Sequence, residues 1–455
     1  MKKYSLINNV LGWVVFLIAT TVYLITAEPT VPWWDCGEYT ATADKLQVGH
    51  PPGAPTFQLI GSLFSIFAGS DTSLVAYTMN AMSAICSGFT ILFLFWTITL
   101  LAKKFVKNKE EMTLGQMIAI FASAVVGSLA YTFSDTFWYS AVESEVYAMS
   151  SCFTAISFWA ILKWEEQADD KHNLRWLILI AFLVGISIGV HLLNLLAIPA
   201  ITYVFYFKKY PNQEKNKKRN FILVGIISML LVAIILYFIV PYIVIFAGKF
   251  EIFFTNSIGL PFNTGTIVYF VLLIGLLVWG VLYSIKKQKV ILNTALLSVL
   301  FILIGYTTFF VLVIRSNANT PINENAPKDA TALLTYLNRE QYGDTPLLHG
   351  QYYNAMVVDQ EESSSKYIKD KESGKYIEVK QRGKLVYESD KTTIFPRMWS
   401  SDASRNHPTY YKMWAGIDEN SDRKPTFAEN LTYFFRYQVN HMYWRYFMWN
   451  FAGRQ

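Results

Sequence analysis

The sequence predicts an all-α polytopic membrane protein with about nine spans, followed by a smaller α+β region. Of its 455 residues, 53% are hydrophobic and 16% are charged, whereas soluble domains carry about 25% charged residues. Apolar runs of about 20 residues recur through the first two-thirds of the chain, and each can cross a bilayer core of about 30 Å. After Arg315 the sequence becomes polar and rich in turn residues. We therefore expect a membrane domain at 1–315 and an extracytoplasmic region at 316–455.

The apolar runs define the predicted spans. The first is interpreted as an uncleaved span and not as a signal peptide, because Ala27-Glu28-Pro29 is a poor cleavage site. The fifth and sixth are short, and either two crossings or one re-entrant pair fits their length. The nine spans are 10–27, 74–102, 115–137, 146–162, 175–190, 194–207, 221–247, 266–285 and 291–314.

Basic residues are concentrated in alternate loops. They occur at Lys2 and Lys3 and in segments 103–109, 163–175, 208–219 and 286–289, with Lys109 and Lys215 among them. The short loops of the other side contain two lysines, Lys45 and Lys249. Cytoplasmic loops carry the excess of basic residues, so the N-terminus is predicted to be cytoplasmic. The loop after the first span and the region after Arg315 then lie on the outer side.

The region after Arg315 is predicted to be mixed in structure. A helix is expected at about 328–341, followed by a short apolar run at 345–349. The alternating segment KYIEVKQRGKLVYES, within 365–392, predicts a β-hairpin. The aromatic end from Asn430 onward is too polar to span and is typical of a helix lying at the membrane interface. Because nothing after Gly453 resembles a domain end, we expect the full-length protein to be longer.

The first outer loop, WWDCGEYTATADKLQVGHPPGAPTF at 33–57, is the main candidate site. Ionisable groups at a membrane boundary are costly to desolvate and usually have a function. If the loop is helical, the spacing of three puts Asp35 and Glu38 on one face, where a carboxylate can act as a general base. The alternative is a solvated loop with a helix-capping aspartate. Cys36 has no evident base beside it and is interpreted as a packed thiol.

Two further elements could complete this site. The corner GHPPGAP at 49–55 restricts the backbone and would aim His50, although it also serves as a simple turn into an interfacial helix. The second outer loop places Glu143 and Glu145 beside Trp138-Tyr139. These carboxylates could bind substrate, or they could stabilise the N-terminus of the next helix.

Isolated polar residues remain near the outer ends of other spans. His191 is as readily a buried, hydrogen-bonded histidine as a site residue. Arg315, followed by several asparagines, suits a lipid phosphate or acts as a snorkelling anchor. The three cysteines predict neither a disulfide nor a metal framework. The net charge of +6 does not indicate nucleic-acid binding, because the basic residues lie in loops between spans.

At these positions the chain resembles membrane glycosyltransferases of the GT-C superfold. They have an acidic motif in the first outer loop, a Pro-Pro corner after it and a second acidic motif after the third span, and the corresponding residues here are Asp35 and Glu38, Pro51-Pro52, and Glu143 and Glu145. WWDCGEYTATADKLQVGHPPGAPTF, WYSAVESEVYAM and RSNANTPINENAP resemble the domain of unknown function 2723 family, which is common in Bacteroidetes. That family is related to a eukaryotic transmembrane O-mannosyltransferase. The resemblance covers about residues 1–320, and His50 stands where some GT-C enzymes have Lys or Arg.

The resemblance implies a bacterial inner-membrane enzyme with its active site on the periplasmic side. Its donor would be a polyprenyl-phosphate sugar such as mannose, and its acceptor a hydroxyl of an exported protein or glycan. Asp35 would be the general base, with Glu38, Glu143 and Glu145 positioning substrate and Arg315, Lys45 or His50 offsetting phosphate charge. No cofactor is implied with certainty beyond the lipid-linked sugar donor: two cations could compensate the phosphate charge without a metal, and a divalent metal stays open. The competing interpretation is a transporter or flippase of lipid-linked intermediates, or an envelope assembly scaffold, and the short spans around His191 favour it.

Overall fold

The computed structural model describes residues 2–108, 111–211, 216–343, 345–361, 365–380 and 383–452. The chain forms two compact units, residues 1–338 and 339–455, and each is described by itself. Over the described residues, seven helices of the first unit are long and apolar enough to cross a membrane. They are Lys2–Thr26, Thr72–Lys103, Leu114–Thr132, Val146–Glu166, Lys217–Ser257, Thr264–Lys286 and Val290–Asn317.

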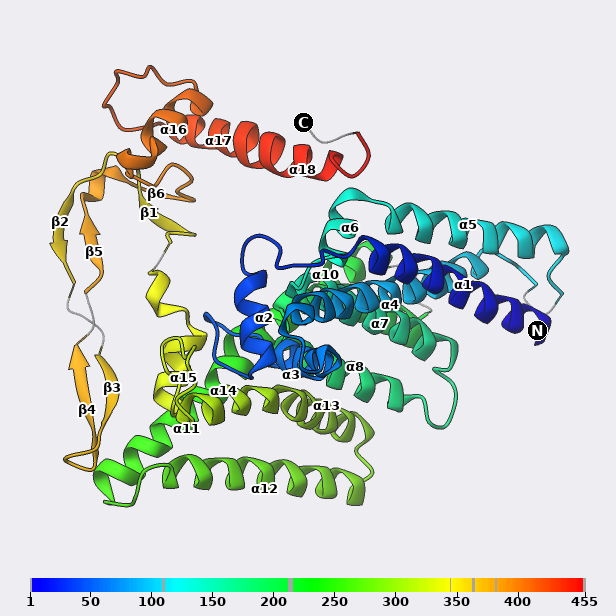
Figure 1. The fold of residues 1–455 in the computed structure, drawn as a ribbon, viewed down its shortest axis with the longest axis horizontal. Helices are drawn as coiled ribbons and strands as arrows, with labels where there is room; N and C mark the ends of the chain where they lie inside the picture. Colours follow the sequence, from blue (N-terminus) through cyan, green and yellow to red (C-terminus); the bar gives the residue numbers. More distant parts are fainter. Residues whose placement is uncertain are drawn as a thin grey trace. The chain divides into compact units, whose positions relative to one another are not determined.

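Helix α4 (Val75–Lys103) is the centre of the first part of the bundle. Helices α1 (Lys2–Thr26), α5 (Leu114–Thr132) and α7 (Val146–Glu166) pack against it (Figure 1). Helix α1 approaches closely at Gly88, where an added Cβ would lie 2.0 Å from the Thr20 hydroxyl. Small residues at such contacts let membrane helices approach each other and gain van der Waals packing.

Helices α8 (Leu174–Ile188) and α13 (Val290–Tyr306) make a close backbone contact at two glycines. A Cβ on Gly185 would lie 2.3 Å from the Ile302 carbonyl oxygen, and one on Gly305 would lie 2.3 Å from the Ile186 nitrogen. The two glycines therefore let the backbones touch. The contact fixes the position of α8, a helix of only 15 residues.

The remaining long helices lie further along the chain. Helix α10 (Lys217–Ile234), the π-helix η5 (Ile235–Ile239), α11 (Val240–Ile252) and the π-helix η6 (Phe253–Ser257) form one run. Its 41 residues span about 60 Å, longer than a bilayer core. Its end is tied to α12 (Thr264–Lys286) by the fully buried Glu251, whose carboxylate accepts hydrogen bonds from Asn263 N–H and Thr266 N–H. After α13 come the 3₁₀ turn η7 (Thr307–Phe309) and α14 (Phe310–Asn317).

Short helices occupy the connections of the first unit. Those in the first outer loop are α2 (Cys36–Asp44) and α3 (Pro55–Ser65), followed by the 3₁₀ turns η1 (Ile66–Ala68) and η2 (Thr72–Leu74). The others are α6 (Asp135–Ala141), η3 (Leu192–Leu196), α9 (Ala197–Lys209) and α15 (Ala330–Leu337). Helix α2 packs on α3, and α15 packs on α11.

In its described residues, the second unit contains three two-stranded antiparallel ladders. β1 (His349–Gln351) pairs with β6 (Thr392–Ile394), β2 (Val357–Gln360) with β5 (Leu385–Tyr387), and β3 (Ser365–Asp370) with β4 (Lys375–Lys380). The helices described in this unit are η8 (Glu340–Tyr342), which precedes β1, η9 (Ser389–Lys391), which precedes β6, and, after β6, η10 (Ala403–Arg405), α16 (His407–Ala415), α17 (Phe427–Tyr433), η11 (Phe434–Trp444) and α18 (Arg445–Met448).

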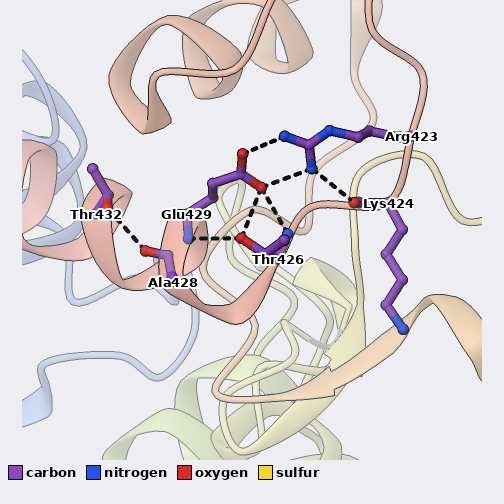
Figure 2. Close-up of polar contacts among 6 residues, drawn as sticks. All are labelled: Arg423, Lys424, Thr426, Ala428, Glu429 and Thr432. Atoms are coloured by element: carbon purple, nitrogen blue, oxygen red, sulfur yellow. Dashed lines mark hydrogen bonds and ion pairs between the residues drawn. The ribbon is translucent and has the colours of Figure 1, made fainter.

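A capping box begins the terminal helical run of this unit. Glu429 N–H donates to the Thr426 hydroxyl (3.2 Å), and Thr426 N–H donates to the Glu429 carboxylate (2.8 Å; Figure 2). Both contacts satisfy donors that a helix N-terminus would otherwise leave unpaired. The ion pair and hydrogen bonds from Arg423 lower the pKa of Glu429 to about 2.

Several expectations from the sequence need correction. The first span begins at Lys2, not at residue 10, and the third ends at Thr132, because α6 starts separately at Asp135. The expected hairpin over KYIEVKQRGKLVYES is wrong, since β4 pairs with the preceding β3 while β5 pairs with β2. The expected helix at 328–341 is shorter, at Ala330–Leu337.

Other expectations keep their standing as predictions. Nine spans are not confirmed, because α8 and α9 are shorter than a full crossing requires. Residues 316–338, which the sequence assigned to the extracytoplasmic region, belong to the first compact unit. Interfacial placement of the aromatic run, now seen as continuous helix over α17, η11 and α18, stays a prediction. Lys109, Lys215 and the residues from Gly453 onward lie outside the described residues.

The glycine contact between α8 and α13 predicts the effect of a single methyl group. Gly305→Ala should destabilise the protein by about 1–3 kcal/mol, because the new Cβ would overlap the α8 backbone. Gly275→Ala in α12 is the matched control, since an added Cβ meets no atom within 4 Å there, and alanine favours helix. Thermal unfolding in one detergent would compare them. Equal melting temperatures would contradict the close contact.

Candidate active site

The centre of the candidate site is a contact between α2 and the corner that follows it. The Glu38 carboxylate accepts the backbone N–H of His50 (2.5 Å to Oε1), and its Oε2 lies 3.0 Å from His50 Nδ1. The hydrogen bond from Glu38 raises the pKa of His50, against an opposing effect of burial. Burial raises the pKa of Glu38, but the hydrogen bonds from His50 outweigh it and hold that pKa below its usual value. The pair is therefore an ion pair at mildly acidic pH.

Asp35 adds a second, more accessible carboxylate to this pair. It occupies the N-cap position of α2, but its side chain makes no capping hydrogen bond. Instead, Oδ2 lies 3.9 Å from His50 Nε2. The side chain is 57% exposed, against 26% for Glu38. The expectation that Asp35 and Glu38 share a helical face is confirmed, and both flank one imidazole.

The corner after α2 is held in place by a segment that is distant in the sequence. Val48 forms a parallel bridge with Asn323, with Val48 N–H donating to the Ile322 carbonyl and Glu324 N–H donating to the Val48 carbonyl. The Tyr336 hydroxyl donates to the Gly49 carbonyl at 2.6 Å. Gly49 cannot be replaced without displacement, because a Cβ would lie 2.5 Å from Glu38 Oε1. Residues 322–336 thus hold the backbone of Val48 and Gly49, which lie some 270 positions earlier in the chain.

The second outer loop lies directly behind α2. The hydroxyls of Thr40 and Ser144 are 3.0 Å apart, and Glu28 N–H donates to the Val142 carbonyl. Burial, followed by the charge of Glu145, raises the pKa of Glu143 to about 7. Glu145 is the N-cap of α7 and accepts the Val146 N–H at 2.8 Å, so the helix-stabilising role is present.

The same electrostatics link Glu145 to the first outer loop. Burial raises the pKa of Glu145, and the nearby charge of Asp35 raises it further while His50 opposes this. The buried Cys36 thiol lies in the same acidic environment, since burial and the charges of Glu143, Glu145 and Asp35 raise its pKa to about 12. Cys36 is therefore a packed thiol, as expected.

Three expected site residues are placed differently. Arg315 donates from Nε to the Leu46 carbonyl and from NH2 to the Lys45 carbonyl, so it clamps the end of α2. Lys45 pairs with Asp44 at 2.9 Å and is 70% exposed. Lys45 follows Asp35 by ten residues, so the backbone that Arg315 contacts lies about 15 Å along the helix from Asp35. His191 caps η3 by accepting the Leu193 N–H, and its ring lies 5.5 Å from that of Tyr147.

One acidic residue of the cluster was missed by the sequence analysis. Glu324 lies in the segment that bridges to Val48, where burial and the charge of Glu38 raise its pKa. The only signal was its position in RSNANTPINENAP, which was noted as a motif without a role for this residue. A distance of more than 270 positions from Glu38 hides such a contact in one sequence.

The site is open to a substrate on the side of Asp35. Trp33 and Trp34 precede it and are 83% and 87% exposed, and the backbone of Trp34 is left-handed (φ 65°). Exposed tryptophans at this boundary suit either an interfacial anchor or a stacking surface for a sugar ring. Over the residues that the structure describes, no group of three or more His, Cys, Asp and Glu is arranged to hold a metal ion.

Comparisons with known proteins match this part of the chain. Residues 35–214 match the model of the protein O-mannosyl-transferase TMEM260 N-terminal domain. Residues 343–435 match a family of unknown function, DUF8416. The first match includes the acidic cluster except Glu324, and it excludes Arg315.

Two curated proteins are also similar to part of the chain. One is the protein O-mannosyl-transferase tmem260 of Dictyostelium discoideum, 28% identical over 156 residues, which are 34% of this chain and 17% of that protein. The other is the protein O-mannosyl-transferase TMEM260 of Mus musculus, 25% identical over 175 residues, which are 38% of this chain and 22% of that protein. The matched segments thus cover about a fifth of each relative. No solved structure matches.

The Glu38–His50 contact predicts a pH-dependent stability. Because the pKa of His50 is raised, the protonated imidazole stabilises the fold below pH 6.5, and this stability is lost as the pH rises through the pKa of the folded state. Because the pKa of Glu38 is lowered, its carboxylate stabilises the fold above pH 4.5, and this stability is lost as the pH falls through the pKa of the folded state. His50→Gln should therefore cost about 1–2 kcal/mol near pH 5.5 and less at pH 9. Thermal unfolding across pH measures this.

His191→Gln is the matched control, because its effect on stability should depend on pH in the opposite direction. Burial lowers the pKa of His191, so protonation opposes folding and the wild type should lose stability relative to this variant as the pH falls below 6.5. A loss for His50→Gln that stays constant from pH 5 to 9 would contradict the ion pair.

Proposed function

We propose that this protein is a membrane glycosyltransferase that moves a sugar, with mannose the first choice, from a polyprenyl-phosphate donor to a hydroxyl of an exported protein or glycan. The observation that carries the proposal is the half-exposed Asp35 carboxylate, fixed beside the Glu38–His50 pair at the mouth of a helical bundle. The similarity of residues 35–214 to proteins named as O-mannosyl-transferases supports it.

In the proposed reaction, Asp35 accepts the proton of the acceptor hydroxyl as its oxygen attacks the anomeric carbon. The bond from this carbon to the phosphate oxygen breaks, and its electron pair leaves with the lipid phosphate. One displacement inverts the anomeric configuration. A positioned base of this kind contributes about 10²–10⁴-fold to the rate. Asp35 suits this role because it is the most exposed of the carboxylates that flank His50.

The remaining groups take positioning roles in the proposal. Glu38 holds His50, and the protonated imidazole keeps Asp35 oriented and offsets charge on the leaving phosphate. Glu143 and Glu145 would accept hydrogen bonds from sugar hydroxyls. Arg315 and Lys45 are assigned to the support of α2, because their contacts lie at its far end.

An apolar cavity supports lateral entry of a lipid donor. It has a volume of about 480 Å³ and lies between α4, α5, α7 and η3. Ser151, which lines it, follows Glu145 by six residues, or about 9 Å along α7. A polyprenyl chain in this cavity would bring its phosphate to the level of Glu145 and His191.

The proposed setting is a bacterial inner membrane, with a GT-C-like membrane domain. The basic loops support a cytoplasmic N-terminus, with the Asp35 cluster and the second unit on the periplasmic side.

The second candidate function is transport or flipping of a lipid-linked intermediate. The helix break at η3, where His191 caps a short turn between α8 and α9, favours it, since transporters bind substrate at broken helices. The described acidic cluster lies instead in the connections between long helices, which favours chemistry at the membrane surface.

Asp35→Asn tests the proposed base. It should reduce transfer of label from radiolabelled polyprenyl-phosphate mannose to exported proteins by at least about 10²-fold, in vesicles of purified protein. Asp135→Asn, in the first turn of α6, is the control for loss of an outer carboxylate and should keep full transfer. Wild-type transfer by Asp35→Asn would exclude Asp35 as the base, and lipid scrambling without transfer would favour the flippase.

Ala155→Trp tests the donor cavity. Filling the space between α4 and α7 should raise the KM for the lipid donor about tenfold while the KM for the acceptor stays constant. Trp176→Phe, outside the cavity, serves as a control for altered aromatic packing. An unchanged donor KM would show that the lipid binds elsewhere.

A further inference from the structure

A second cavity lies at the other end of the helices that carry the candidate active site. It has a volume of about 570 Å³ and is lined by α1, α4 and α7. Helix α1 begins there at Lys2, while α4 and α7 end there at Lys103 and Glu166. Since α7 begins after Glu145 and has 21 residues, the cavity lies about 30 Å from the acidic cluster. That distance equals one bilayer core, so the proposed transfer does not use this cavity.

The charge of this cavity is opposite to that of the candidate active site. Its ionisable lining residues are Lys2, Lys103, Lys163 and Glu166. Lys103 Nζ lies 3.3 Å from Glu166 Oε1, and Lys163 Nζ lies 2.7 Å from Glu166 Oε2. One carboxylate thus holds two ammonium groups side by side. Each ammonium has three donors, so both keep donors for an anion, and the lining is positive overall.

Aromatic rings and amides complete the cavity. The rings of Trp96 and Trp159 lie 5.8 Å apart in its wall, and Lys103 stands 5.6 Å above the ring of Tyr4. Trp and Tyr are typical of the interface between membrane and water. Asn8 also lines the cavity, and its buried Oδ1 has no hydrogen-bond partner among the described residues. An unpaired buried amide oxygen is costly, and a headgroup hydroxyl that donates to it would remove that cost.

The geometry points to a binding site for the phosphate headgroup of an anionic phospholipid. Two ammonium groups fixed by Glu166 can bind the negative charge of a phosphodiester. Basic pockets between membrane helices are known to bind anionic lipid headgroups in this way. The surface next to the cavity explains why the occupant is a lipid. Exposed apolar residues continue from it along one face of α1, and these are Leu6, Val10, Trp13 and Leu17. An acyl chain can pack against this apolar stripe, whereas a free phosphate has no apolar part that could do so.

Native mass spectrometry of the full chain, released from nanodiscs of mixed phosphatidylglycerol and phosphatidylcholine, tests the site. The wild type should retain phosphatidylglycerol selectively. Lys103→Gln combined with Lys163→Gln should lower this retention at least about tenfold, because two charged hydrogen-bond donors are lost. Lys104→Gln is the matched control, since Lys104 is the next residue, pairs with Glu165 and does not line the cavity. It should retain the lipid as the wild type does.

Two further variants separate binding from folding. Lys103→Arg with Lys163→Arg keeps both charges and should keep the lipid, and Lys2→Gln removes an exposed charge whose loss should not affect folding. Lys2→Gln should lower retention about threefold. The proposal is overturned if Lys104→Gln loses the lipid to the same extent, or if both lipids are retained equally. Displacement of the lipid by millimolar inorganic phosphate would assign the cavity to free phosphate and also overturn it.

Discussion

The candidate site depends on one contact, the hydrogen bonds from His50 to the Glu38 carboxylate. Both the backbone N–H and the ring of His50 engage this carboxylate, so one side chain sets the path of the corner and the orientation of the imidazole. The contact exists because Gly49 has no side chain, since a Cβ would occupy the position of the carboxylate. The surroundings then follow, with Asp35 against the far side of the ring and Tyr336 holding the Gly49 carbonyl. If this contact were lost, Asp35 would be an ordinary exposed aspartate.

Burial separates the carboxylates of the cluster into two kinds. Asp35 is open to solvent, whereas Glu143 and Glu145 are buried behind α2 and have raised pKa values. Burial is the largest cause of the raised pKa values of Glu143 and Glu145. Glu145 also caps α7, so its position is fixed by the helix as well as by the cluster. The capping contact and the acidic cluster therefore constrain the same side chain.

The sequence predicted what depends on local composition and missed what depends on long-range contacts. Apolar runs predicted the helices, and acidic and proline motifs predicted that Asp35, Glu38 and His50 belong together, because these residues are near one another in the chain. The role of Arg315 and the presence of Glu324 could not be predicted, since both depend on contacts across about 270 residues. The wrong hairpin has a similar cause. Alternation identifies strands such as β4 and β5, but not which neighbour each of them pairs with.

The bridge between Val48 and Asn323 can form only after about 320 residues have been synthesised. Ribosomes add about 5–20 residues per second, so the loop that carries Asp35 leaves the ribosome about 15–50 seconds before the segment that supports it. During this interval α1 and α4 can insert, but the loop lacks the Tyr336 and Arg315 contacts that fix it. A competent arrangement of the acids therefore arises only after the last long helix has been inserted. Biosynthesis thus delays site formation until the bundle is complete.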